Sequence, residues 1–235
     1  MKCETIVPRI VKLFDGLVSA GQWRGLNQYL QYLNTSKKKV FFVEIGSNDG
    51  KMFDPVYDFV MAGTWSGIMV EPVEFYFKQL QENYCNSPNL IFENVAISEK
   101  EEIRAFYRIE EGHDFLPKWT HGLGSFYEDV LLTHERVIPG LRKYIIKQNV
   151  ECISFSTLLD RNAVTNVDVL VIDTEGFDYQ VIKQIDFKRI QPYIIVYEHK
   201  HLSRSDGLVC RQYLQNQGYV LEKHLGNTLA WCDSH

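Results

Sequence analysis

The chain has 235 residues, of which 45% are hydrophobic and 23% are charged, and its formal net charge is −5. This length and apolar content predict one domain of ordinary size with a complete core, and they exclude a disordered chain. The acidic balance argues against a nonspecific nucleic-acid binder, since phosphate binding needs an excess of Lys and Arg. It argues weakly against an anionic membrane surface as well.

Apolar runs and cysteines indicate the cellular setting. No apolar run approaches 18 residues, and the first residues contain no signal-peptide apolar region, so we expect neither a membrane span nor secretion. The five cysteines are widely spread and include no Cys-x-x-Cys pair. This pattern favours buried thiols in a reducing cytoplasm over a disulfide framework or a zinc site. We therefore expect a cytoplasmic protein without nucleic-acid or membrane partners, while a homo-oligomer stays open.

The N-terminal segment is predicted to be helical. Apolar residues recur at helical spacing over residues 4–34, on both sides of Gly21. We assign residues 1–36 to a helical extension and residues 37–235 to the main domain. Packing of these helices on a sheet edge is the simplest interpretation, and a lid over a ligand or an oligomer contact is the alternative.

The segment after residue 39 predicts a strand that runs into a ligand-binding turn. Val40–Ile45 is apolar enough for a parallel strand covered on both faces, except for Glu44, whose carboxylate is costly to bury without a partner. Its Glu-x-Gly-x-x-x-Gly spacing differs from the dinucleotide fingerprint Gly-x-Gly-x-x-Gly. It favours a ligand with a cation and a ribose but no phosphate, such as S-adenosylmethionine. The expected cofactor contacts of this strand and turn are Glu44, Gly46, Ser47, Asn48 and Gly50.

A second acid follows where a ribose would need it. After a helix near 55–61, the next strand ends at Glu71, a little over 20 residues past the first glycine of the turn. An acid at this strand end can accept hydrogen bonds from both ribose hydroxyls. Pro72 suits the first turn of a helix near 72–84 and is counted with the cofactor contacts. A third strand near 90–96 brings three more candidates, Asn94, Val95 and Ala96, to the same edge.

The remaining elements continue the alternation of strand and helix. Short strands are predicted at 102–108 and 150–155, and the irregular insert at about 109–149 is a candidate substrate loop or lid. The next predicted elements are a strand at 167–173, a helix at 179–187, a strand at 193–198 and a helix at 206–216. Residues 218–225 and 228–232 predict a closing antiparallel hairpin. Such alternation predicts an α/β fold with a parallel sheet and helices on both faces.

The later strands end in groups that favour catalysis. Asp173 emerges from a buried strand, and it is expected to accept a hydrogen bond from the methionine amino group or from a substrate hydroxyl. Asp173 and Glu198 together offer hard oxygens suited to Mg²⁺, so a divalent ion stays open although no ligand set is assigned. His199 is the candidate general base, with backbone bonding at a strand end as the alternative. The catalytic candidates are His199, Asp173 and Glu198, with His121 and His134 of the insert in reserve.

Five segments together resemble the FkbM family of S-adenosylmethionine-dependent methyltransferases. They are residues 43–50, 70–72, 94–98, 124–126 and 172–178, and the resemblance extends over about 40–199. It implies a Rossmann-like class I methyltransferase fold with a mostly parallel seven-stranded sheet. It also implies O-methylation of a hydroxyl on a sugar or other secondary metabolite, with a small-molecule or glycan acceptor. By the family pattern, Glu44, Gly46 and Glu71 would contact the cofactor, and the Asn94–Ala96 turn would lie near adenine.

Two other classes of function stay open. One is a non-catalytic module on the same fold that binds S-adenosylmethionine or a partner, against which the acids and histidine at the strand ends argue. The other is a nicotinamide-dependent oxidoreductase, which the absence of Gly-x-Gly-x-x-Gly disfavours. Cofactor binding followed by a methyl-transfer screen separates the three classes.

Overall fold

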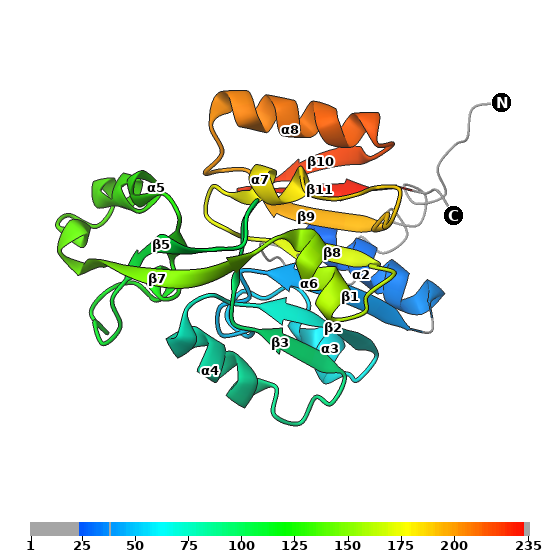
Figure 1. The fold of residues 1–235 in the computed structure, drawn as a ribbon, viewed down its shortest axis with the longest axis horizontal. Helices are drawn as coiled ribbons and strands as arrows, with labels where there is room; N and C mark the ends of the chain where they lie inside the picture. The colour runs from blue at the N-terminus through cyan, green and yellow to red at the C-terminus, as the bar shows by residue number, and fades with distance from the viewer. Residues whose placement is uncertain (1–23, 38, 233–235) are drawn as a thin grey trace.

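The computed structural model describes residues 24–37 and 39–232, and a seven-stranded sheet forms its centre (Figure 1). The strands lie in the order β3 (Leu90–Glu93), β2 (Trp65–Val70), β1 (Val40–Ile45), β8 (Val169–Ile172), β9 (Ile194–Glu198), β11 (Asn227–Trp231) and β10 (Val220–His224). Only β11 runs antiparallel to its neighbours, whereas β1, β2, β3, β8 and β9 pair in parallel. The predicted mostly parallel sheet with a closing hairpin is confirmed.

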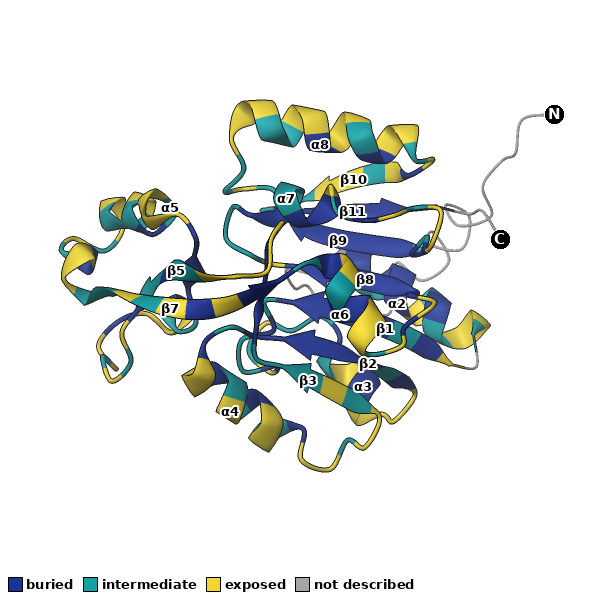
Figure 2. Ribbon diagram, in the orientation of Figure 1, coloured by how far each residue is buried: buried dark blue, intermediate teal, exposed yellow. Residues whose placement is uncertain are grey.

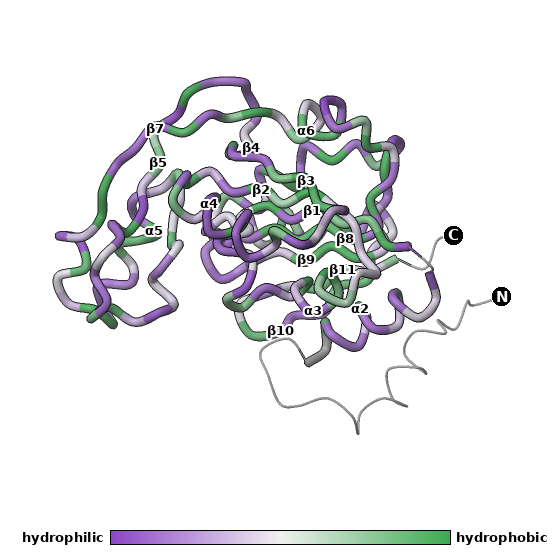
Figure 3. The backbone as a smooth tube through the Cα atoms, turned by 90° about the horizontal axis from the view of Figure 1, so that it is seen from below, coloured by the Kyte–Doolittle hydropathy of each residue, from purple (hydrophilic) through white to green (hydrophobic). Residues whose placement is uncertain are grey.

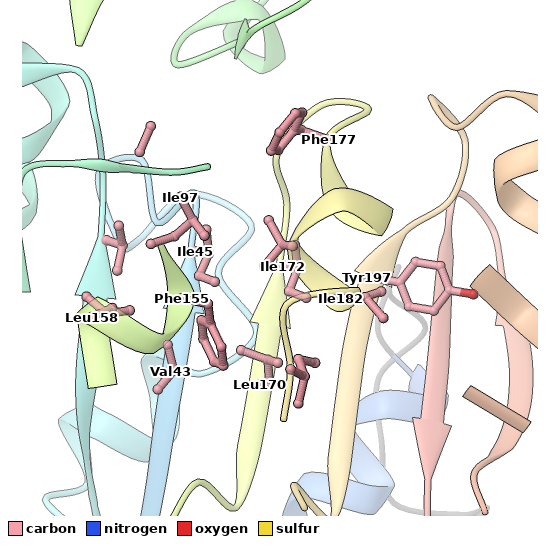
Figure 4. Close-up of a cluster of buried hydrophobic side chains, with 14 of the residues drawn as sticks. Val43, Ile45, Ile97, Phe155, Leu158, Leu170, Ile172, Phe177, Ile182 and Tyr197 are labelled. Atoms are coloured by element: carbon pink, nitrogen blue, oxygen red, sulfur yellow. The ribbon is translucent and has the colours of Figure 1, made fainter. Parts of the chain in front are cut away.

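Helices cover both faces of this sheet, because successive side chains of a strand point to opposite sides. On one face, Val43 and Ile45 of β1 join a core cluster with α6 (Phe155–Arg161), α7 (Asp178–Ile182) and α8 (Arg204–Asn216). Figure 4 shows part of this cluster, where the ring of Phe155 lies beside the strands. On the other face, Phe42 packs with α2 (Arg24–Ser36) and α3 (Tyr57–Met61). The central strands are accordingly buried throughout, whereas the helices are exposed on their outer sides (Figure 2).

Helix α2 is part of this core. Its Tyr29 ring lies 4.8 Å from the ring of Trp231, and Asn34 Oδ1 accepts a 2.9 Å hydrogen bond from Trp65 Nε1. Packing on the sheet, the simpler interpretation of the N-terminal pattern, therefore describes α2. The other helix expected in residues 4–34 lies outside the described residues, and the domain division at residue 36 stays a prediction.

The segment predicted as an irregular insert is largely ordered structure. Strands β5 (Glu102–Ile109) and β7 (Ile145–Ile153) pair antiparallel along their whole length and form a second sheet with the short strands β4 (Ala96–Ile97) and β6 (Gly124–Ser125). Seen from below in Figure 3, this arm extends to one side of the main sheet. Helix α5 (Glu128–Thr133) and 3-10 helices at 118–120, 134–136 and 141–144 complete it around a small core of its own. The prediction of an insert without strands at 145–149 was wrong.

Three smaller predictions also need correction. The strand expected at 90–96 is divided, since β3 ends at Glu93 and the chain then enters the second sheet as β4. Phe155 begins helix α6, whose N-terminus is capped by Ser154 Oγ, and is not the end of a strand. Pro72 precedes helix α4 (Glu74–Asn83) by two positions, so it is not in the first turn. Among the described residues, no helix is long and apolar enough to cross a membrane.

Candidate active site

The carboxyl ends of β1, β2, β8 and β9 surround a cavity of about 320 Å³. Parallel strands deliver their carboxyl ends to one edge of a sheet, which is where such folds bind ligands. Among the described residues, the cavity wall contains one lysine, Lys200, and six acidic side chains: Glu44, Asp54, Glu71, Asp173, Glu175 and Glu198. The structure therefore brings together the four strand-end acids that the sequence singled out, and it adds two more.

The turn after β1 is held tightly between the neighbouring strands. Gly46 has a φ of +86°, and a Cβ there would overlap the backbone carbonyl oxygen of Asp173. The backbone N–H groups of Gly46 and Ser47 both donate to Val70 O, at 2.9 and 3.0 Å. A Cβ on Gly50 would overlap the side chains of helix α4. The glycines are therefore required by the close approach of protein segments to one another.

Glu71 lies at the cavity with both carboxylate oxygens oriented by backbone amides. Oε1 accepts a 2.8 Å hydrogen bond from Val73 N, and Oε2 accepts a 2.9 Å bond from Asn48 N. Each oxygen keeps a second lone pair, which suits the two hydroxyls of a ribose. Burial raises the pKa of Glu71 to about 7, although these backbone bonds oppose the shift. Asn94 does not line the cavity but donates to the backbone carbonyl of Glu71 at 2.8 Å, and Val95 and Ala96 form the wall beside it.

Glu44 is a buried acid without a cation. It is 4% exposed, and its Oε2 has no hydrogen-bond partner among the described residues. Burial, followed by the charge of nearby Asp54, raises its pKa well above the usual value. Asp54 itself accepts hydrogen bonds from Val56 N at 2.6 Å and from the Tyr84 hydroxyl at 2.9 Å. The sequence analysis missed Asp54, because it lies in a loop and follows no strand.

A second group of charged side chains gathers at the ends of β8 and β9. His201 Nε2 lies 2.9 Å from Glu175 Oε2 and 3.7 Å from Glu198 Oε2, while Lys200 Nζ pairs with Glu198 Oε1. The fully buried Asp178 holds this group in position through hydrogen bonds to two of its segments. Its Oδ1 accepts a 2.9 Å bond from Glu198 N, and its Oδ2 accepts a 2.9 Å bond from Thr174 Oγ1.

Burial and neighbouring charges raise the pKa values of two acids in this group. Burial, and then the charges of Asp173 and Glu175, raise the pKa of Glu198 to about 10. The Asp173 carboxyl is open to the cavity, yet the surrounding protein removes much of its bulk water. This desolvation, and then the charge of Glu175, raise the pKa of Asp173 to about 7. Such shifts are typical of functional sites.

His199 lies apart from this group. Its Nδ1 is 3.0 Å from Thr228 Oγ1, and it is not among the residues that line the cavity. Neighbouring residues of an extended strand point to opposite faces, so the strand that turns Glu198 towards the cavity turns His199 away. The role of His199 as a base stays a prediction. The sequence analysis did not consider His201, whose side-chain direction depends on how the chain bends after β9.

The insert closes the cavity from the other side. Trp119, Phe126, His121 and His134 all contribute to its wall. Asn48 Nδ2 donates a 3.1 Å bond to the His121 carbonyl, and a Cβ on Gly122 would overlap the Asn48 side chain. The expected binding loop therefore contacts the turn after β1 directly. Tyr127, next to Phe126 in the chain, is 40% exposed and lies outside the wall.

The comparisons with known proteins agree with this architecture. Residues 44–221 match the methyltransferase FkbM domain family. The structure is similar to the crystal structure of methyltransferase FkbM from Methylobacillus flagellatus KT, with a TM-score of 0.51 and 13% sequence identity over 92% of this chain and 45% of that chain. The chain thus spans less than half the length of that relative.

Other solved structures show weaker similarity. Precorrin-6y C5,15-methyltransferase from Geobacter metallireducens GS-15 has a TM-score of 0.43 at 12% identity, over 93% of this chain and 92% of that chain. Human methyltransferase 10 domain containing protein has a TM-score of 0.42 at 10% identity, over 93% and 85%. No curated protein sequence matches the chain. Because the family match covers most of the chain and includes all the strands around the cavity except part of β1, the protein belongs to the FkbM family of methyltransferases.

Proposed function

We propose that the protein is an S-adenosylmethionine-dependent O-methyltransferase whose acceptor is a hydroxyl of a sugar or another secondary metabolite. The observation that carries the proposal is the buried Glu44 carboxylate beside Glu71 in one cavity, whose Oε2 has no hydrogen-bond partner among the described residues. A buried carboxylate without a cation is costly, and a cationic ligand removes that cost. A ribose with two free hydroxyls complements the two oxygens of Glu71.

The cavity residues fit this cofactor in order along the sheet edge. Glu71 would hold the ribose, and Val95 and Ala96 would form an apolar wall for the adenine. Glu44 and the 46–50 turn would face the methionine portion. When bound, S-adenosylmethionine supplies a methyl group activated by a sulfonium. The absence of a lysine or arginine on this half of the wall, among the described residues, suits a cofactor without phosphate.

The opposite half of the cavity suits a neutral, hydroxylated acceptor. Asp173, Glu175 and Glu198 can form hydrogen bonds with acceptor hydroxyls, and the ionised Glu175 disfavours an anionic acceptor. The rings of Trp119 and Phe126 offer apolar faces for a sugar ring. The Asp173 carboxylate, which lines the cavity, would accept the proton that the acceptor hydroxyl releases on methylation. The protein otherwise aligns the two reactants.

Calorimetry with S-adenosylmethionine, followed by a screen for transfer of its labelled methyl group, tests this function. The screen should compare sugars and other polyhydroxylated metabolites with amine and carboxylate acceptors. We expect cofactor binding and label transfer to hydroxyls. A chain that is folded by circular dichroism but does not bind the cofactor would refute the proposal, and binding without transfer would favour the non-catalytic module.

Replacement of Glu71 by alanine is expected to weaken S-adenosylmethionine binding by about tenfold or more. The change removes two charge-assisted hydrogen bonds to the ribose, each of which contributes about 1.5–3 kcal/mol. Titration calorimetry measures the effect. Glu74→Ala, on the exposed start of α4, is the matched control. Equal affinities of Glu71→Ala and wild type would remove Glu71 from the cofactor site.

Cofactor binding is also expected to depend on pH. With a pKa raised to about 7, Glu71 is mostly protonated at pH 6 and mostly ionised at pH 8. Ribose hydroxyls donate to the ionised form, so affinity should rise with pH, by up to about tenfold between these values. Calorimetry at both pH values measures this change. The isosteric Glu71→Gln variant should bind weakly with a flatter pH profile, and an unchanged slope in that variant would assign the dependence to another group.

A further inference from the structure

Four buried atoms that can bind a metal lie beside the cavity without a hydrogen-bond partner among the described residues. They are His134 Nε2, Glu175 Oε2, Glu198 Oε2 and His201 Nε2, of which the last three contact one another as ion pairs. The side chains of Glu198 and His201 are only 4% and 10% exposed. Buried polar atoms in folded proteins nearly always have a hydrogen-bond partner, so this group of atoms favours a further ligand.

The spacing of these atoms fits a shared cation. The ligand atoms of His134, Glu175 and His201 lie within 4.8 Å of one another, and so do those of Asp173, Glu175 and Glu198. Glu175 Oε2 and His201 Nε2 form an ion pair at 2.9 Å. Two ligands at right angles around one ion, each about 2.1 Å from it, lie about 3 Å apart. The observed separation is therefore compatible both with this ion pair and with two neighbouring ligands of one ion.

Three separate segments are fixed around this point. Glu175 has a φ of +48°, an uncommon conformation for a residue other than glycine, and its carbonyl accepts a 2.7 Å bond from Ser125 Oγ of β6. A Cβ on the next residue, Gly176, would lie 3.2 Å from Val130 of α5 and 3.3 Å from the His201 carbonyl. The insert, the turn after β8 and the segment after β9 thus interlock at the cluster.

The charge of the cluster also favours a cation. Three carboxyl groups, Asp173, Glu175 and Glu198, face one another here. Among the described residues, Lys200 is the lysine that pairs with them, and it contacts Glu198 Oε1, while Glu198 Oε2 lies 3.7 Å from His201 Nε2. A metal dication would favour the ionised form of these crowded carboxyl groups.

We propose that His134, Glu175 and His201 bind a first-row transition-metal dication such as Zn²⁺ or Mn²⁺, with Glu198 beside them. Two imidazole nitrogens with carboxylate oxygens suit these ions, whereas Mg²⁺ prefers oxygen ligands and keeps its waters. The ligand set therefore differs from the pair Asp173 and Glu198 that the sequence suggested for Mg²⁺. The ion would orient the acceptor hydroxyl, and this role rests on the proposed function. Binding of the ion does not depend on that function.

Metal titration of the untagged, chelator-treated full chain tests this site. Calorimetry with Zn²⁺ and Mn²⁺ should show a single site per chain, and Co²⁺ should give an absorption band of a histidine-ligated ion. His201→Ala and His134→Ala should each weaken binding by at least about 100-fold, since loss of a direct ligand exceeds the 10–100-fold typical of outer-shell changes. His199→Ala is the matched control, because that ring contacts Thr228 and should leave metal affinity unchanged.

Circular dichroism and the isosteric Glu175→Gln variant separate loss of a ligand from loss of folding. A folded Glu175→Gln protein with weakened metal binding supports the site. Wild type that binds neither Zn²⁺ nor Mn²⁺, or an equal loss in His199→Ala and His201→Ala, overturns it. S-adenosylmethionine affinity measured on the same metal-free protein keeps the two proposals apart. Metal binding without cofactor binding contradicts the proposed function alone, and cofactor binding without metal binding contradicts this site alone.

Discussion

Asp173→Asn is expected to lower methyl-transfer turnover by about 10²–10⁴-fold, the usual contribution of a positioned general base. The change keeps the size of the side chain and removes only its charge and its ability to take a proton. Asp173 is open to the cavity at the end of β8, next to the acceptor half of the wall. The measurement is kcat together with S-adenosylmethionine affinity from calorimetry.

The affinity distinguishes the two roles considered for Asp173. Near-normal affinity with lost turnover assigns it to the acceptor proton, whereas a collapse of affinity assigns it to the methionine amino group. Asp160→Asn is the matched control, since Asp160 lies on α6 in a surface ion pair with Arg189. His199→Ala in the same assay tests the other candidate base. Full activity of Asp173→Asn with lost activity of His199→Ala would restore the assignment from sequence.

Gly46→Ala is expected to destabilise the fold by more than about 3 kcal/mol, because two independent costs add. One is the left-handed backbone at φ +86°, which costs an alanine about 1–2 kcal/mol. The other is overlap of the new Cβ with the Asp173 carbonyl, which would push the ends of β1 and β8 apart. Urea denaturation monitored by circular dichroism measures the loss.

Gly63 provides a control that isolates the second cost. Its φ is +74°, and no atom lies within 4 Å of a Cβ built there. Gly63→Ala should therefore lose only the backbone cost of about 1–2 kcal/mol. Similar losses in the two variants would mean that the β1 and β8 ends separate freely, against the present interpretation. The expectation from the sequence that Gly46 contacts the ligand would then be the better interpretation.

The close contact at Gly46 also connects the two halves of the site. Asp173 N donates a 2.9 Å hydrogen bond to Ile45 O, so the end of β1 and the first residue after β8 are held backbone to backbone. Asn48 links the turn after β1 to the insert through a hydrogen bond to the His121 carbonyl. The turn after β1 therefore contacts both the acids at the end of β8 and the arm.

Local patterns in the sequence were enough to predict the main sheet and to locate the acids at its edge. Val40–Ile45 and Val169–Ile172 are apolar on both faces, and such runs form strands covered by helices. The order of strands and helices along the chain then requires parallel pairing, and parallel strands end at one edge. Glu44, Glu71, Asp173 and Glu198 could be placed on the cavity from these local patterns alone.

Three features depend on long-range packing and could not be predicted from local patterns: the arm, the passage of the chain from β3 to the second sheet after Glu93, and the direction of side chains beyond strand ends. Pairing of β5 with β7 joins residues about 40 positions apart, and no local pattern specifies that partner. Glu198 and His201 lie close together because the chain bends after β9, where the alternation of a strand no longer applies. His134, in the 3-10 helix at 134–136 that follows α5, reaches the same place only because the arm folds back over the cavity. Side-chain direction outside regular elements depends on long-range packing, which periodicity in the sequence does not encode.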